Sequence, residues 1–359
     1  NAGALKLPES LRRIGEKAFS HNSGTYRLCL PETVEEIGKY AFYLSALKYI
    51  RFGTGLKRIE ASAFYSCELT TLTLPDGLEY IGDSAFNRCD LVHLDLGQGL
   101  REIGAEAFAY NSLLRELSFP ASVEVLGEAS FFGCSSLRFT TYENTKYLGN
   151  NNHPYLVLIG VTNTGLSSYT IHENTKIIAP SAFKDCRRIA NIVIPDSVTS
   201  IGGYAFADCL GLTSISIENS VTFIGDGVFR NCKDLTSIAI PDGVTSIGNY
   251  AFYGCNNLTS ATLGDGVTSI GNYAFSGCGN LTSVTMGNSV TSIGNYAFYN
   301  CRRLTNIVIP ESVTSINPEV FSGCGNLTIY CEAESQPEGW DTSWNPDHCP
   351  VEWGYKTEE

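Results

Sequence analysis

The side chains best suited to chemistry in this chain are five histidines and thirteen cysteines. The histidines are scattered along the chain, at His21, His93, His153, His172 and His348. No nucleophile elbow, phosphate-binding loop or His-Glu-x-x-His zinc motif accompanies them. His93 and Asp95 alternate within one short apolar segment and so share a strand face, but no nucleophile is indicated beside them. We therefore expect a protein that is not an enzyme and has no cofactor.

Ten of the cysteines recur three residues after a phenylalanine, at Cys67, Cys89, Cys134, Cys186, Cys209, Cys232, Cys255, Cys278, Cys301 and Cys324. Zinc requires clustered Cys-x-x-Cys-like ligands that close a tetrahedron, which this spacing does not supply. Disulfides between stacked repeats are also disfavoured, because parallel side chains about 4.8 Å apart miss the Cβ separation of about 3.8 Å. We expect no metal, and buried thiols that fill a tight slot or cap turn carbonyls, a place that Asn22, Ser45 and Asn111 take in other repeats.

Cys331 and Cys349 stand apart from this series, in a segment that contains all three tryptophans, Trp340, Trp344 and Trp353. A stack of repeats needs its last apolar unit covered. Residues 331–359 are therefore expected to form a Trp-rich cap closed by a Cys331–Cys349 disulfide, which would imply an oxidising compartment. The alternative is an aromatic platform for a ligand such as a sugar. Cys29, between two leucines, is expected to face outward as a free thiol.

The elements that position these residues are repeats of 22–23 residues, marked by Phe19, Phe42, Phe64, Phe86, Phe108, Phe131, Phe183, Phe206, Phe229, Phe252, Phe275, Phe298 and Phe321. Each unit begins with an alternating strand pattern that Leu5–Pro8 already show, and ends with Ile-Gly-x-x-Ala-Phe-x-x-Cys, where we expect a helical or 3₁₀ turn. One unit cannot bury its apolar side, whereas stacked units cover one another. The prediction is an α/β solenoid of about 14 leucine-rich-type repeats over residues 1–330, with a parallel sheet on its concave face and short strands, turns and 3₁₀ or one-turn helices elsewhere.

The Leu-Thr-x-Ile-x-Ile-Pro and Ile-Gly-x-x-Ala-Phe-x-x-Cys segments resemble bacterial leucine-rich repeats of the BspA-like type over residues 5–330. The resemblance implies an exported surface protein of host-associated bacteria or protists, a group that includes adhesins. It implies no shared catalytic or binding residues, so it indicates a class and not a ligand. We accordingly expect a secreted or bacterial cell-surface protein whose signal or anchor lies outside this chain.

Residues 138–176 interrupt the repeats. A loop at 149–154 precedes an apolar strand at 155–159, and strand character resumes at 168–171, which predicts a hairpin inserted into one repeat. The insertion is either an indel tolerated at the surface or a hinge or projecting recognition element. It separates a charge-balanced stretch, residues 1–189, from an acidic one, residues 190–359.

The net charge of −13 disfavours nucleic acid as a partner. No apolar run is long enough for membrane insertion. The turn aspartates Asp196, Asp242 and Asp265 are explained either by turn chemistry or by an acidic edge that binds calcium.

A partner is expected on the solvent-facing strand positions, which are chemically varied only in the first half: Tyr49, Arg51, Thr71, Thr73, His93, Asp95, Glu116 and Ser118. The corresponding positions of the second half are mostly hydroxyl side chains. A second candidate is the set of turn-face tyrosines, for which duplication of one repeat is the other explanation: Tyr204, Tyr250, Tyr273 and Tyr296. We expect a monomeric, adhesin-like module for a host or microbial surface protein, and keep as alternatives a structural spacer or carbohydrate binding through the Trp-rich segment.

Overall fold

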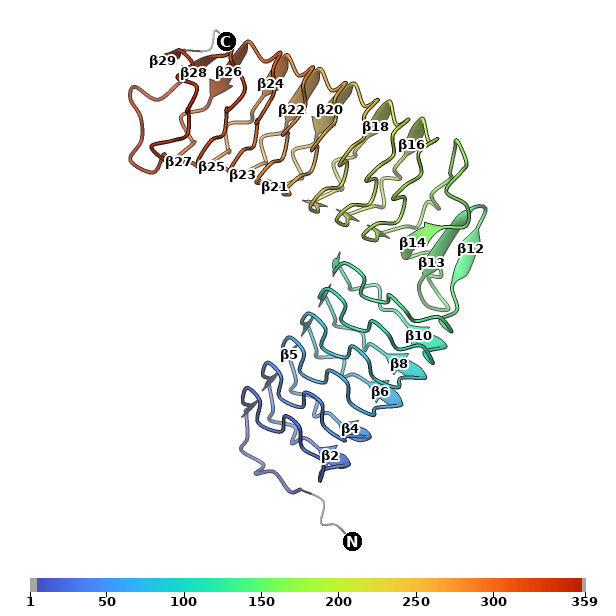
Figure 1. Cartoon of the computed structure of the whole chain (residues 1–359). Helices are drawn as coiled ribbons and strands as arrows, with labels where there is room; N and C mark the ends of the chain where they lie inside the picture. The colour runs from blue at the N-terminus through green and yellow to red at the C-terminus, as the bar shows by residue number, and fades with distance from the viewer. Residues whose placement is uncertain (1–4, 357–359) are drawn as a thin grey trace. The chain divides into compact units, whose positions relative to one another are not determined.

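The computed structural model describes residues 5–356 and divides them into two compact units built of short parallel strands (Figure 1). The N-terminal unit runs to Thr141 and includes Tyr147–Val157; the C-terminal unit comprises Tyr142–Lys146 and the chain from Leu158 onward. Each unit is a parallel β-solenoid, so the predicted solenoid of leucine-rich repeats is confirmed. Leu5–Pro8 are not part of a strand, contrary to the prediction.

In the N-terminal unit, each turn contributes two strands to two separate rows. One row holds the strands β2 (Arg27–Cys29), β4 (Tyr49–Arg51), β6 (Thr71–Thr73), β8 (His93–Asp95) and β10 (Glu116–Ser118). The other row is a continuous sheet of two-residue strands, β1 (Arg13–Ile14), β3 (Glu36–Ile37), β5 (Arg58–Ile59), β7 (Tyr80–Ile81), β9 (Glu102–Ile103) and β11 (Val125–Leu126). Strands pair in register one repeat apart, so that Leu94 lies between Leu72 and Leu117.

The C-terminal unit repeats the same plan. Its longer strands are β16 (Asn191–Val193), β18 (Ser214–Ser216), β20 (Ser237–Ile240), β22 (Ser260–Leu263), β24 (Ser283–Thr285), β26 (Asn306–Ile309), β28 (Thr328–Cys331) and β29 (Val351–Trp353). Its two-residue strands are β15 (Ile177–Ile178), β17 (Ser200–Ile201), β19 (Phe223–Ile224), β21 (Ser246–Ile247), β23 (Ser269–Ile270), β25 (Ser292–Ile293) and β27 (Ser315–Ile316). The short strands expected outside the main sheet therefore pair with one another and form a second row.

The irregular segment contains the strands β12 (Thr140–Tyr142), β13 (Thr145–Leu148) and β14 (Val157–Val161), which are consecutive neighbours in one sheet. Two residues join β12 to β13, so these two strands form a hairpin within residues 138–176, whereas the sequence indicated strands at 155–159 and 168–171. The strand expected at 168–171 does not form. Tyr169 is instead held by its side chain, since its hydroxyl donates to the carbonyl of Asn163 at 2.6 Å.

The segment around each repeat phenylalanine is not helical, and residues 5–356 contain no helix. The expected helical turn is replaced by two residues of left-handed φ, for example Tyr250 (φ 58°) and Gly254 (φ 70°) on either side of Phe252. The N–H of Ala251 donates to Gly248 within its own turn, at 3.4 Å, whereas the N–H of Phe252 donates to Ala274 of the next turn, at 2.7 Å. Alternate backbone N–H groups of this segment therefore donate to carbonyls of the neighbouring turn. In an α-helix, by contrast, each backbone N–H donates to a carbonyl of the same helix.

The core of each unit is a column of stacked phenylalanine rings. Ring centroids are 5.0–5.5 Å apart from Phe19 to Phe131 and 4.9–5.7 Å apart from Phe183 to Phe321. The rings are nearly parallel because identical residues sit one above another at the spacing of neighbouring strands. Leucine, isoleucine and valine side chains complete the core around them.

The repeat cysteines confirm the expectation of buried thiols that cap carbonyls. The Sγ of Cys255, for example, donates to the carbonyl of Phe229 in the previous turn at 3.1 Å. Asn111 takes the same place with its amide, 2.9 Å from the carbonyl of Phe86 and 2.8 Å from that of Phe108. Burial raises the pKa of Cys67 to about 11 and that of Cys278 to about 12, because the charged thiolate is disfavoured away from water.

The predicted Cys331–Cys349 disulfide is wrong, since both residues are free thiols. Strand register is the physical reason: β28 pairs with β29 so that Cys331 lies opposite Trp353. Cys349 extends the series of repeat thiols, with its Sγ 3.5 Å from the carbonyl oxygen of Cys324. The inference of an oxidising compartment from these cysteines loses its basis.

The Trp-rich segment forms one further turn of the C-terminal unit. Trp340 pairs with Ile316 in a parallel bridge, and its indole N–H donates to the carbonyl of Val313 at 3.0 Å. The Trp344 ring lies against Phe321, with centroids 6.0 Å apart. Trp340 and Trp344 are 4% and 5% exposed, so their ring faces cover the core instead of forming a ligand platform.

Replacing a central ring of the phenylalanine column should destabilise the protein strongly. Phe252 is fully buried between Phe229 and Phe275, so Phe252→Ala is expected to cost about 3–5 kcal/mol in chemical denaturation. Phe19 stacks on Phe42 and is half-exposed, so Phe19→Ala is the matched control, with a much smaller loss. Equal losses for the two variants would contradict the stacking model.

Thiol labelling should separate the single exposed cysteine from the buried ones. Cys29 is exposed, as expected, and the other twelve cysteines are buried. Because the thiolate is the reactive form, an aromatic disulfide reagent at neutral pH should modify one thiol per native chain and all thirteen after unfolding. Cys29→Ser should abolish the native reaction, and rapid labelling of that variant would disprove the burial of the thiol series.

Candidate binding site

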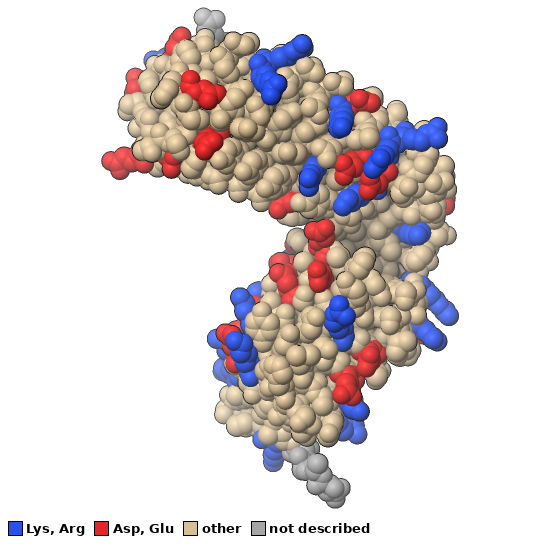
Figure 2. Space-filling view, in the orientation of Figure 1, with Lys and Arg blue, Asp and Glu red and all other residues tan. Residues whose placement is uncertain are grey.

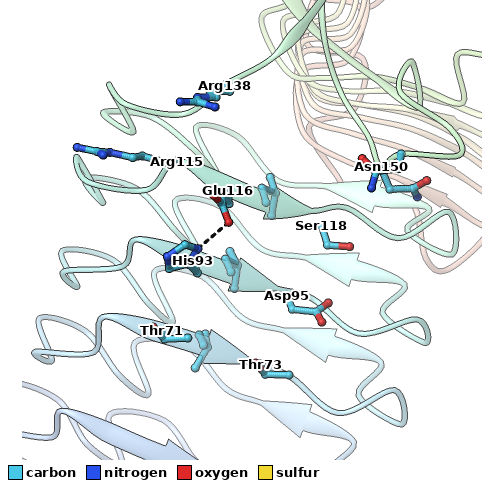
Figure 3. A pocket seen from close by; sticks show the side chains of 13 residues that line it. Thr71, Thr73, His93, Asp95, Arg115, Glu116, Ser118, Arg138 and Asn150 are labelled. Atoms are coloured by element: carbon cyan, nitrogen blue, oxygen red, sulfur yellow. Dashed lines mark hydrogen bonds and ion pairs between the residues drawn. The ribbon is translucent and has the colours of Figure 1, made fainter.

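The strand face of the N-terminal unit contains a depression of about 480 Å³. Strands β6, β8 and β10 form its floor, and Figure 3 shows their side chains projecting into it. Six of the eight residues predicted for the first-half binding face line it: Thr71, Thr73, His93, Asp95, Glu116 and Ser118. The parallel register brings them together, because Thr71, His93 and Glu116 stand in one row and Thr73, Asp95 and Ser118 in the next.

His93 and Glu116 form the one hydrogen-bonded side-chain pair marked on this floor. The Nδ1 of His93 lies 2.8 Å from Oε2 of Glu116, and the two side chains are 51% and 69% exposed. A pair this exposed contributes roughly 0.2–1 kcal/mol. No serine, threonine or cysteine within the described residues hydrogen-bonds to His93, so His93 is not paired with a nucleophile in this arrangement.

Two arginines that the sequence reasoning did not single out, Arg115 and Arg138, border the depression at the start of β10 (Figure 3). Both are exposed, and within residues 5–356 neither has an ion-pair partner. Most other arginines of the unit are ion-paired, as Arg101 is with Glu124 at 2.8 Å, and Arg27 and Arg88 lie over tyrosine rings instead. Unpaired guanidinium groups beside a depression are suited to carboxylates. Arg115 precedes its strand and Arg138 belongs to the irregular segment, so the repeat pattern alone did not reveal them.

The loop at 149–154 closes the opposite end of the depression through Asn150 and Asn151. Asn150 is fixed in place: its Nδ2 donates to the carbonyl of Phe119 at 2.9 Å, and its Oδ1 accepts from the N–H groups of Asn152 and His153 at 3.0 and 2.9 Å. The insertion therefore contributes two side chains to the lining of the depression.

The other two predicted residues, Tyr49 and Arg51, lie on β4 and do not line the depression. Arg27 lies over the Tyr49 ring, 4.8 Å from its centroid, and Arg51 pairs with Glu32 at 3.3 Å. Arg51 borders a smaller depression that also contains Cys29 and Glu32. The pKa of Glu32 is lowered by hydrogen bonds from Thr54, with Arg51 adding to the effect.

The turn-face tyrosines form a partial ladder in the C-terminal unit. Tyr250, Tyr273 and Tyr296 stack in sequence, with centroids 5.0 and 4.8 Å apart. Gly227 occupies the position between Tyr204 and Tyr250, so Tyr204 is separated from the stack. Because stacked rings cover each other's faces, the ladder exposes ring edges and hydroxyl groups. It is poorly suited to stacking on a sugar.

Turn chemistry accounts for the regular aspartates. Oδ1 of Asp242 accepts the N–H of Asp265 at 2.9 Å, and Oδ1 of Asp265 accepts the N–H of Asn288 at 3.2 Å. No group of three or more metal-ligating side chains is found in residues 5–356.

A search of the same residues finds no candidate helix for crossing a membrane. Most of the surface in Figure 2 is uncharged, with acidic and basic side chains interspersed.

The repeated sequence pattern and the rows of parallel strands are those of a leucine-rich repeat protein. The model of the BspA type leucine rich repeat region matches residues 1–67, 35–154, 161–278 and 222–334, and the chain belongs to this family. No protein of curated function is similar enough in sequence to match.

Three solved structures are similar to this chain. A leucine-rich repeat protein from Bacteroides ovatus is 27% identical, covers 96% of this chain and 87% of its own, and has a TM-score of 0.46. A leucine rich cell surface protein from Faecalibacterium prausnitzii is 27% identical over 77% of this chain and 83% of its own, with a TM-score of 0.41. The pneumococcal vaccine antigen PcpA is 24% identical over 95% and 84%, with a TM-score of 0.41.

Removing the Asn150 side chain should loosen the loop that closes the depression. Asn150→Ala deletes its hydrogen bonds to Phe119, Asn152 and His153 and should lower the local stability of the loop by about 1–3 kcal/mol. Hydrogen exchange of residues 149–154 should accelerate while the core strands exchange as before. Asn151→Ala, which changes an exposed neighbour, is the control, and equal exchange in the two variants would refute the anchoring role.

Proposed function

We propose that this protein is a non-catalytic, extracellular or cell-surface module that binds a host or microbial surface protein through the strand face of its N-terminal unit. The observation that carries the proposal is the depression in which six chemically varied strand residues meet two arginines without ion-pair partners. Its mixture of hydroxyl, carboxylate, imidazole and guanidinium groups is of the kind that discriminates between protein surfaces.

Membership of the BspA-type family supports a location outside the cell, as the sequence resemblance implied. The burial of twelve thiols is compatible with that location, because a buried, protonated thiol is protected from oxidants. The proposed partner is a protein and not a sugar, since Trp340 and Trp344 are buried and the tyrosine ladder presents ring edges. We propose a monomer that binds no nucleic acid and does not insert into a membrane.

The C-terminal unit supports a second role as a structural spacer. Its strand face is a regular row of small side chains, in which Ser237, Ser260 and Ser283 pair in register. Threonine hydroxyls on successive turns repeat one contact, as when Thr282 donates to the carbonyl of Thr259 at 3.0 Å. Such uniform side chains stiffen the stack but offer little chemical variety for recognition.

The binding site can be tested by screening the protein against immobilised matrix proteins and glycans and repeating each positive with variants. Arg115→Ala/Arg138→Ala should weaken binding about tenfold or more, because charge-assisted contacts contribute about 1.5–3 kcal/mol each. His93→Ala should have a smaller effect in the same direction.

The charge-matched control is Arg302→Ala/Arg303→Ala, which removes two exposed arginines of the C-terminal unit. It should bind as the unmodified protein does. A partner whose affinity falls with the control variant and not with Arg115→Ala/Arg138→Ala would move the site to the C-terminal unit and overturn the proposal. Tyr49→Ala and Arg51→Ala, outside the depression, should leave the affinity unchanged.

A further inference from the structure

The strand β10 has a free edge. It is the last strand of a three-stranded sheet with the order β10-β8-β6. At the start of this strand, the N–H of Glu116 donates to the carbonyl of Val92 beside β8, at 3.4 Å. Consecutive residues of a parallel strand direct their polar backbone groups to opposite sides. The N–H and C=O of Leu117 therefore point away from β8, where the described residues place no paired strand.

The inserted hairpin is the reason that this edge is free. One repeat beyond β10, the chain should add the next strand of the row, but Thr140–Tyr142 form β12, whose neighbour is β13. The loop of the insertion closes only one end of the edge, where the N–H of Phe119 donates to the carbonyl of Gly149 at 3.4 Å. Leu117 is half-buried and lines the depression together with Arg138 and Asn150. Figure 3 shows Arg138 and Asn150 toward opposite ends of this strand.

A groove runs along the free edge. A second depression, of about 360 Å³, shares Leu117, Arg138, Asn150 and Asn151 with the first. Leu117 is half-buried at this edge, whereas its register partner Leu94 is 3% exposed. An unpaired strand edge with an open groove beside it is a template for another extended chain, which supplies the missing main-chain hydrogen bonds.

The charges at the groove indicate the kind of chain it takes. Arg115 and Arg138 stand at the start of the edge without ion-pair partners in residues 5–356, while Glu116 is bonded to His93. We propose that an extended, acidic peptide segment of a partner protein adds to β10 as a further strand. It hydrogen-bonds to the N–H and C=O of Leu117 and places a carboxylate against the two arginines. This inference rests on the proposed function and specifies how that site takes its partner.

The first test uses the unmodified protein and three labelled synthetic peptides. The probe alternates valine and threonine and carries aspartates at one end; one twin has alternate amides N-methylated, and the other has asparagine for aspartate. By fluorescence anisotropy the probe should bind saturably. Each twin should bind about tenfold more weakly, since one loses main-chain hydrogen bonds and the other loses the charge-assisted contacts. Equal binding of the N-methylated twin, or no saturable binding of the probe, overturns strand addition.

The second test changes the protein. Leu117→Pro removes the outward N–H but leaves the hydrogen bonds of Glu116 and Ser118 to β8, and proline is tolerated at strand edges. We expect about tenfold weaker binding of the probe, and a similar loss for Arg115→Ala/Arg138→Ala, but none for Arg302→Ala/Arg303→Ala. If Leu117→Pro lowers the unfolding temperature, the comparison of the N-methylated peptide with the probe decides the matter on the unmodified protein.

The outcomes distinguish this inference from the proposed function. A protein partner whose binding falls with Arg115→Ala/Arg138→Ala but not with Leu117→Pro keeps the proposed site and overturns strand addition. A partner that binds both variants as it binds the unmodified protein overturns the proposed site itself. If sedimentation shows a dimer of the protein that Leu117→Pro dissociates, a second copy occupies the edge, and the proposed peptide partner is wrong.

Discussion

Each unit depends on the register in which one turn hydrogen-bonds to the next, at an offset of one repeat. The register places Phe252 on Phe229, and it brings the thiol of Cys255 to the carbonyl of Phe229. A single turn would leave its apolar side and half of its backbone donors without partners. Stability therefore belongs to the stack and not to the turn, as in other repeat proteins.

The same register tolerates a locally unfavourable backbone. Two residues of each repeat take left-handed φ, and many of them are not glycine, such as Ser62, Ser84 and Tyr273. A left-handed residue costs roughly 1–2 kcal/mol, and the hydrogen bonds between successive turns offset that cost. Because the backbone and the inward side chains are constrained, the outward positions are the ones free to vary. The two units differ mainly at those positions.

The candidate site arises where the repeat is broken. Regular turns present rows of side chains from equivalent strand positions, so that only the residue type changes from one turn to the next. The insertion adds what a regular turn does not: Asn150 and Asn151 at one end of the depression, and an edge of β10 that the next turn does not cover. An interruption in a repeat protein can thus combine a loop, a charged rim and a free strand edge within a few residues.

The sequence by itself determined the period, the solenoid, the phenylalanine core and the buried thiol series, because all of these follow from one pattern repeated in register. It also placed Thr71, His93 and Glu116 on one face. It did not reveal the left-handed turns around the phenylalanines, because an Ala-Phe pair with polar neighbours fits a helical turn equally well. The disulfide was predicted because both cysteines lie in the segment expected to cap the last repeat, whereas the pairing of β28 with β29 decides which residues face each other.

Only the tertiary structure brought Arg115, Arg138 and Asn150 to the same depression around β10. These residues come from a turn, an irregular segment and an inserted loop, which share no periodicity. Their proximity depends on how the insertion folds back on Phe119, a contact between residues far apart in the sequence. A repeated pattern allows the core to be predicted from the sequence. The position of the residues at a break in the repetition is determined by long-range packing.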